Sequence, residues 1–317
     1  MDLKKIEPLL GINMLYNVEE ENVSPLDWAN EHQEAVKSFV ERNGVLLIRG
    51  FKNIEENEFG TILSQLFGGE LIDYAYRSTP RTELKGKVYT ATEYHHSEWI
   101  PQHNEKAYSN KWPTRIGLVC KVKAAKMGNT PISDSRVAYQ EIPAEIRDEF
   151  EKKGVMYVRN YSNIDLPWTE VFQTESKAEV EAFCRANNIF VEWTPMGLRT
   201  KQINKATLVH PVTQEKLWFN QAHLFHVSNL DSELREGLVA VMGEENLPRN
   251  TYYGDGTPID PAVLDVIRGV YEKTKMSFDW QVNDLLLLDN MLYTHGREPF
   301  EGSRKVLVGM ANEYSLA

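Results

Sequence analysis

The chain has 317 residues, of which 42% are hydrophobic and 26% charged, so it can bury a sizeable core. Its net charge of −11, without clusters of lysine and arginine, argues against nucleic acid as a partner. Two cysteines exclude a disulfide framework, and no apolar run can serve as a signal peptide or cross a membrane, so we expect a reduced, soluble, cytoplasmic protein.

Helical and extended patterns alternate in the first half of the chain. Residues 27 to 42 carry apolar side chains on one helical face, and residues 58 to 67 repeat that pattern before two glycines. Between them, residues 44 to 51 form a short apolar run bounded by glycines, which predicts a buried strand. Residues 115 to 123 alternate apolar with polar side chains, the pattern of a half-buried strand.

The second half contains more short strands, with helices between them. Helices are predicted over residues 144 to 153, 178 to 188 and 232 to 243, and from residue 260 onward. Strands are predicted over residues 155 to 161, 206 to 212, 216 to 219, 278 to 282, 284 to 288 and 305 to 310. With no repeat, linker or composition change, we expect one α+β domain over residues 1 to 317, built around a β-sandwich or barrel.

One histidine stands out among eight because of its neighbour. His103 and Glu105 are two residues apart, so on an extended segment both side chains point the same way and offer a metal one nitrogen and one oxygen. His295 follows a buried strand that can hold a second imidazole rigidly. Two histidines and one carboxylate form the facial triad of non-haem Fe(II) oxygenases, which leaves three coordination positions open.

A cation follows the second histidine. Arg304 can clamp the far end of a dicarboxylate whose other end chelates the metal, although a surface cation at the start of a strand is an equal interpretation.

Six segments together resemble the TauD/TfdA family of Fe(II)- and 2-oxoglutarate-dependent dioxygenases, in the family's order and over nearly the whole chain. They are residues 43–51, 102–108, 128–134, 210–220, 253–256 and 289–304. The resemblance implies a double-stranded β-helix (jelly-roll) core flanked by helices. It also implies that His103, Glu105 and His295 bind Fe(II), with O₂ as the second cosubstrate, and that Thr130 and Arg304 hold the far carboxylate of 2-oxoglutarate.

The sequence departs from the taurine dioxygenase pattern in two ways. Glu105 stands where that enzyme has aspartate, which is similar to the branch of clavaminate synthase and the SyrP-like amino-acid hydroxylases; a carboxylate at this position also disfavours halogenation. The step of nine residues from His295 to Arg304 is short for the family, which leaves Arg297 as a less suitable alternative clamp.

Four residues are candidates for substrate binding. Asn220, Gln221 and His223 resemble a pocket-side segment of SyrP-like members, and Arg81 could meet an anionic group of the substrate. The alternatives are ordinary polar residues at a strand end and, for Arg81, a structural role.

These residues predict a hydroxylase of an unactivated C–H bond in an amino acid or related small polar metabolite, free or bound to a carrier protein, in secondary metabolism such as antibiotic biosynthesis. A zinc-dependent hydrolase on a cupin-like barrel could use similar ligands, but it would have no use for Thr130 and Arg304. A non-catalytic binding protein of the same fold is a third possibility, against which the complete ligand set weighs.

Overall fold

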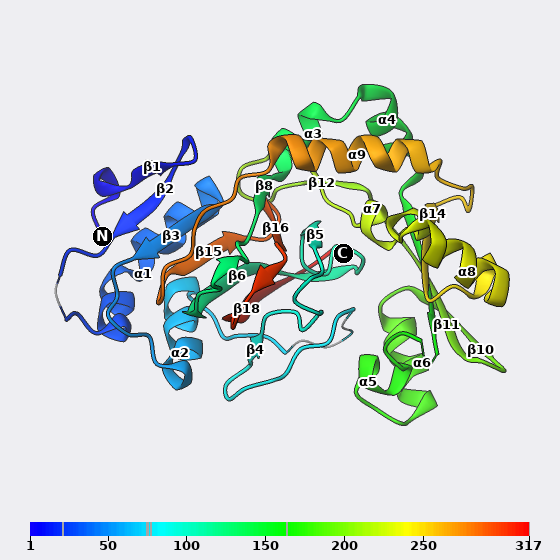
Figure 1. Ribbon diagram of the computed structural model, residues 1–317, viewed down its shortest axis with the longest axis horizontal. Coiled ribbons are helices and arrows are strands. Elements are labelled where there is room, and N and C mark those ends of the chain that lie inside the picture. Colours follow the sequence, from blue (N-terminus) through cyan, green and yellow to red (C-terminus); the bar gives the residue numbers. More distant parts are fainter. Residues whose placement is uncertain (21, 74–75, 77, 163, 317) are drawn as a thin grey trace.

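The computed structural model describes residues 1–20, 22–73, 76, 78–162 and 164–316 (Figure 1). Its largest sheet has seven strands, in which β2 and β3 are parallel and all other neighbours antiparallel. In spatial order they are β1 (Glu7–Leu9), β2 (Ile12–Asn17), β3 (Val45–Arg49), β15 (Leu285–Asp289), β6 (Lys111–Val122), β18 (Lys305–Ser315) and β4 (Val88–Thr90).

Two helices cover one face of this sheet, namely α1 (Pro25–Asn43) and α2 (Glu56–Phe67). Both predicted helices are confirmed, with ends within two residues. The Ser24 side chain caps the start of α1, and Gly44 ends it with φ = 89°. A Cβ on Gly44 would lie 2.7 Å from the Tyr293 ring, so both the backbone angle and the space require glycine there.

A second, smaller sheet packs toward the other face. It consists of β5 (Ile100–His103), β16 (Tyr293–Arg297) and β8 (Ile132–Asp134), with β16 in the centre and both pairings antiparallel. Leu286 and Leu288 share a buried cluster with Ile132 and Tyr293 of this small sheet. Leu285 and Leu287, which point the opposite way from β15, belong to the cluster under α1 and α2. The strand that leads to His295 is therefore buried on both faces.

The prediction of a half-buried strand over residues 115 to 123 is wrong about burial. In β6 the exposed fraction is 6% for Arg115, and Gly117 faces Leu63 so closely that a Cβ would lie 2.2 Å from a methyl carbon. Arg115 and Gly117 are buried because Arg115 pairs with the buried Asp289 and the glycine admits the Leu63 side chain of α2. Lys121 and Lys123, at the end of the predicted strand, are partly or fully exposed as the pattern predicts. The predicted strand over residues 278 to 282 is also wrong, because those residues form an irregular connection.

The middle of the chain builds a second part with its own apolar cluster. Its sheet has the order β10 (Ile189–Thr194), β11 (Gly197–Asn204), β9 (Val155–Tyr161) and β14 (Arg249–Tyr253), and all its pairings are antiparallel. The helices of this half are α3 (Ser135–Glu141), α4 (Ala144–Lys153), α5 (Trp168–Phe172), α6 (Lys177–Ala186), α7 (Ala222–Phe225), α8 (Ser232–Met242) and α9 (Pro261–Thr274). Figure 1 places α5, α6 and α8 at the end of the molecule opposite α1.

Short elements complete the fold. Two pairs of short strands lie beside the sheets: β7 (Lys126–Met127) pairs with β17 (Phe300–Glu301), and β12 (Thr207–Val209) pairs with β13 (Lys216–Trp218). Short 3-10 helices cover Leu3–Lys5, Val227–Asn229 and Glu244–Asn246. Within the described ranges, the helices are all too short or too polar to cross a bilayer.

Candidate metal and cosubstrate site

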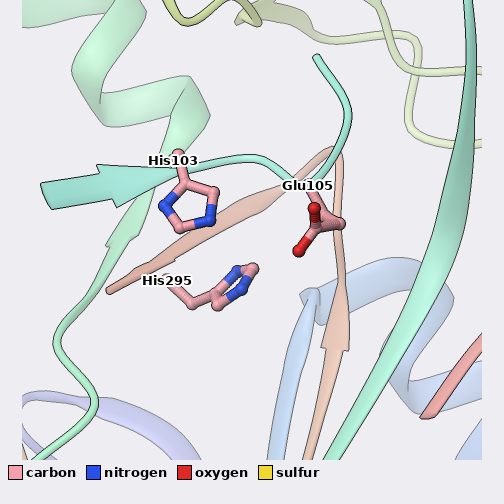
Figure 2. Close-up of side chains that lie close together, drawn as sticks. All are labelled: His103, Glu105 and His295. Carbon is pink, nitrogen blue, oxygen red and sulfur yellow. The ribbon is translucent and has the colours of Figure 1, made fainter. Parts of the chain in front are cut away.

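Two strands from distant parts of the sequence bring three predicted ligands together. His103 at the end of β5 lies directly opposite His295 in β16, and the two imidazole ring centres are 4.7 Å apart. Figure 2 shows both rings and the Glu105 carboxylate turned toward one another. One ligand atom from each residue lies within 4.8 Å of the other two, and all three residues are buried. The site thus has the donor set and the convergence that a facial metal triad needs.

The protonation of the two imidazoles suits metal binding. Nδ1 of His103 donates a hydrogen bond to the Pro101 carbonyl over 2.8 Å, which leaves Nε2 of the neutral ring with its lone pair. Burial lowers the pKa of His103, and burial followed by the proximity of His103 lowers the pKa of His295 to about 3. In the described part of the chain, Nδ1 of His295 is buried without a hydrogen-bond partner. Two neutral, buried imidazoles are the form in which histidine binds a metal.

Glu105 is fixed through both its side chain and its backbone. Its Oε2 accepts a hydrogen bond from Nη2 of Arg81 over 2.7 Å, in an ion pair with both side chains buried. The Asn290 side chain takes a hydrogen bond from the Glu105 N–H at 2.7 Å and donates one to its carbonyl at 2.9 Å. Arg81 thus lies at the triad, where its cation balances the carboxylate charge.

A cavity opens beside the two histidines. It is lined by Arg81, Ala91, Thr92, Ile100, His103, Leu118, Thr130, His295, Gly296, Arg297 and Arg304. Thr130 and Arg304, whose roles the resemblance implies, therefore share one cavity with His103 and His295. Nη2 of Arg304 lies 3.4 Å from the Thr130 hydroxyl, and its Nε donates to the Gly128 carbonyl over 2.7 Å. Burial, and then the charge of Arg297, lower the pKa of Arg304 to about 10. A bound anion would relieve both effects.

Arg297, the alternative clamp, has other partners. Its guanidinium donates to four main-chain carbonyls between residues 92 and 98, at distances from 2.7 to 3.2 Å. These contacts attach that segment to β16, so Arg297 shapes the cavity wall. The guanidinium of Arg304 instead points its Nη2 donor toward the Thr130 hydroxyl.

The other predicted substrate contacts lie behind β5. Nδ2 of Asn220 donates to the Ala206 carbonyl, Nε2 of Gln221 donates to the Asn104 carbonyl, and Nε2 of His223 donates to the Gln102 carbonyl. None of the three belongs to the cavity lining described above. Gln221 and His223 instead hold the backbone on either side of His103.

Sequence reasoning missed two residues of the site. Asn290, which holds the backbone of Glu105, follows a buried strand directly, and the pair Asp289-Asn290 at a strand end was the available signal. Trp280 contacts Thr130 from a segment predicted as a regular strand, and no local pattern indicates that contact.

Comparison with known families and curated proteins finds relatives along most of the chain. Residues 5–311 match the family model described as "Taurine catabolism dioxygenase TauD, TfdA family". Dapdiamide synthesis protein DdaC of Enterobacter agglomerans is 42% identical over 277 residues, which are 87% of this chain and 84% of that protein. A clavaminate synthase-like protein of Arabidopsis thaliana is 27% identical over 292 residues, 86% and 83% of the two chains.

Solved structures share the fold at low sequence identity. PvcB from Pseudomonas aeruginosa is 16% identical with a TM-score of 0.55, over 93% of this chain and 84% of that one. An asparagine oxygenase in complex with Fe(II), 3-hydroxyasparagine and succinate is 12% identical with a TM-score of 0.54, over 92% and 86% of the chains. A complex of AAD-2 with Mn(II) and N-oxalylglycine has a TM-score of 0.53 at 12% identity, over 94% and 93%.

Proposed function

Because this chain belongs to the TauD/TfdA family and is an Fe(II)- and 2-oxoglutarate-dependent dioxygenase, we propose that it hydroxylates an unactivated C–H bond of an amino acid or a related small polar metabolite. Two findings support this substrate class. A relative at 42% identity is a dapdiamide synthesis protein, and a protein of similar fold binds a hydroxylated amino acid. The same relative supports a place in secondary metabolism.

The convergence of His103, Glu105 and His295 is the observation that carries the proposal. These three side chains would bind Fe(II) on one face, through two neutral imidazoles and one carboxylate. When bound, iron and 2-oxoglutarate supply the oxidising power, with O₂ consumed and 2-oxoglutarate converted to succinate and CO₂. The chain's own residues hold the ligands in place, keep water out and direct one C–H bond of the substrate toward the metal.

Thr130 and Arg304 would hold the distal carboxylate of 2-oxoglutarate. Support comes from their shared cavity, from the 3.4 Å between their polar atoms, and from the engagement of Arg297 elsewhere. A guanidinium and a hydroxyl together match a carboxylate, which accepts hydrogen bonds and donates none when ionised.

The seven-stranded sheet and the β5-β16-β8 sheet would be the two sheets of a double-stranded β-helix. The buried cluster that joins Leu286 of one to Ile132 and Tyr293 of the other supports this arrangement, with the triad at the end of the smaller sheet.

Arg81 is the best placed of the four candidate substrate residues, because it lines the cavity beside Glu105. Gln221 and His223 would act on the substrate through the backbone on either side of His103, which they contact directly. Asn220 would act less directly, through the Ala206 carbonyl that it contacts. The substrate would be a small molecule, free or attached to a carrier protein.

The test has two stages. Anaerobic addition of Fe(II) and 2-oxoglutarate should give a weak visible charge-transfer band, which His103→Ala and His295→Ala should abolish together with succinate formation. A panel of amino acids, free and carrier-bound, is then assayed by succinate release and product mass, where a gain of one oxygen identifies hydroxylation.

Retention of the band and of full succinate formation in both variants would contradict the ligand assignment. Turnover with Zn²⁺ alone, indifferent to O₂ and to 2-oxoglutarate, would favour a hydrolase on the same barrel. A complete lack of 2-oxoglutarate decarboxylation by Fe(II)-loaded protein would favour a non-catalytic binding protein.

A further inference from the structure

The hydroxyl of Thr130 receives two hydrogen bonds from side-chain donors. Nε1 of Trp280 lies 3.1 Å from Thr130 Oγ1, and Nη2 of Arg304 lies 3.4 Å from it. The exposed fraction is 1% for Thr130 and 2% for Trp280. An indole N–H and a guanidinium can only donate, so both lone pairs of the hydroxyl oxygen are directed to protein donors. The hydroxyl proton is the hydrogen-bonding function that remains, and within the described residues it has no acceptor.

The backbone fixes Trp280 against Thr130. Ile132 and Met276 exchange two main-chain hydrogen bonds, of 2.8 and 2.9 Å, which join the segment after α9 to the one that carries Thr130. The Trp280 ring then packs on Phe278 with ring centres 4.9 Å apart and an interplanar angle of 63°. The indole N–H is therefore aimed at Thr130 by the fold itself, before any ligand enters the cavity that Thr130 lines.

We propose that Trp280 is a positioning residue that fixes the Thr130 hydroxyl as a hydrogen-bond donor, and so selects a cosubstrate whose distal group is a carboxylate rather than a carboxamide. The inference rests on the proposed role of Thr130 in cosubstrate binding. An ionised carboxylate has two acceptor oxygens, one for the Thr130 hydroxyl and one for the Arg304 guanidinium. A carboxamide has a single acceptor oxygen, so its NH₂ group must face either a guanidinium that only donates or a hydroxyl oxygen whose lone pairs are already taken. A threonine free to rotate would serve both groups, so the discrimination comes from the indole.

The test compares two unreactive ligands that differ only at the distal group. N-Oxalylglycine ends in a carboxylate, and N-oxalylglycinamide ends in a carboxamide. Their affinities for the Mn(II)-loaded protein are measured by calorimetry, which needs no turnover. Trp280→Phe removes the indole N–H and keeps an aromatic ring. Phe278→Leu is the matched control, because it disturbs the same packing and leaves the N–H in place.

Trp280→Phe should weaken N-oxalylglycine binding about three- to tenfold, the change expected from one misdirected hydrogen bond, and should leave the carboxamide affinity unchanged or improved. The ratio of the two affinities therefore falls, while Phe278→Leu keeps the wild-type ratio. In a Thr130→Val background, Trp280→Phe should have no further effect, because the residue acts through the hydroxyl.

If Trp280→Phe lowered the affinities for both ligands equally, the indole would only pack against its neighbours. If the effects of Trp280→Phe and Thr130→Val were additive, Trp280 would act independently of Thr130. Either result would overturn this inference and leave the proposed function untouched. If Thr130→Val left N-oxalylglycine binding intact, the proposed carboxylate contact of Thr130 would fail, and the inference with it. The charge-transfer test with His103→Ala and His295→Ala concerns the iron ligands. Its result does not depend on how Trp280→Phe or Thr130→Val behaves.

Discussion

Arg81 and Glu105 form a buried ion pair whose carboxylate is also a proposed metal ligand. Two cations would then share one carboxylate, so Arg81 stabilises the metal-free protein and opposes metal entry. Removal of one partner from a buried ion pair costs about 3–5 kcal/mol, because the other charge is left uncompensated. The metal would restore that compensation when it binds.

Arg81→Met should therefore lower the melting temperature of the metal-free protein and enlarge the rise in melting temperature produced by Fe(II) or Mn(II). Thermal unfolding with and without metal measures both quantities. Arg49→Met, which breaks the Arg49–Asp284 ion pair away from the triad, is the control that should lower stability without enlarging the metal effect. A metal-induced rise that is smaller in Arg81→Met than in wild type would contradict this account.

Two further histidines are buried in the neutral form. Burial lowers the pKa of His223 to about 3 and the pKa of His226 to about 4. The unfolded chain takes up protons on both rings near pH 6.5, while the folded chain does not until the pH is much lower. Since the unfolded state binds more protons in this window, the free energy of unfolding should fall as the pH drops from about 6.5 toward 4.

Denaturant unfolding at pH 7, 6 and 5 measures that slope. His226→Asn removes one of the two groups, so it should make the decrease in stability between pH 7 and 5 shallower than in wild type. A variant slope equal to or steeper than the wild-type slope would show that His226 is not held neutral by the fold.

The segment that carries Glu105 is held by Asn290, in the turn between β15 and β16, rather than by a neighbouring strand. Asn290 pairs with both the N–H and the carbonyl of Glu105, and it also donates to the Pro113 carbonyl over 2.8 Å. Without it the backbone of Glu105 loses both hydrogen bonds, so the carboxylate no longer has a fixed direction. Partners that orient a metal ligand are worth about 10- to 100-fold in metal affinity.

Asn290→Ala should weaken Mn(II) binding by about that factor, as measured by calorimetry. Asn283→Ala is the matched control, because Asn283 is also buried and bonds to the backbone of residues 52 and 54 at the other end of β15. Both variants should lose stability, and only Asn290→Ala should lose metal affinity. Equal metal affinity in the two variants would contradict the orienting role.

Elements with strong local signals were predictable from sequence. The helix α1 has an N-cap serine, an apolar face and a terminal glycine, and its predicted ends are close to the observed ones. The strands β10 and β11 were not predicted. In β11 polar residues such as Thr200 and Gln202 occupy buried positions, so the apolar pattern is weak. In β10 four of the six residues are apolar but only Ile189 is buried, so its side chains do not mark one face as the core. The strand β16 was also missed: all its residues are buried, yet it reads Tyr-Thr-His-Gly-Arg, since it lines the site instead of filling a core.

At the scale of the whole molecule, the site exists because β5 and β16 pair across 192 positions of sequence. Spacing predicted that His103 and Glu105 share a face, and the local sequence pointed to His295 after a buried strand and to Arg304 beyond it. The resemblance added Thr130 and the roles of these residues. The contacts of Arg297 and Trp280 could not be predicted, because each depends on a tertiary neighbour with no signal in its own segment. For Asn290 the local signal was only its place after a buried strand, which does not reveal that its side chain contacts Glu105. A single domain over residues 1 to 317 stays a prediction.

A crystal of the protein grown anaerobically with Fe(II), measured at the iron absorption edge, tests the central claim most directly. We expect one strong anomalous peak within bonding distance of one nitrogen each of His103 and His295 and of a Glu105 oxygen, with three coordination positions left for non-protein ligands. A peak at another site, or no peak among these three side chains in iron-loaded crystals, would contradict the account.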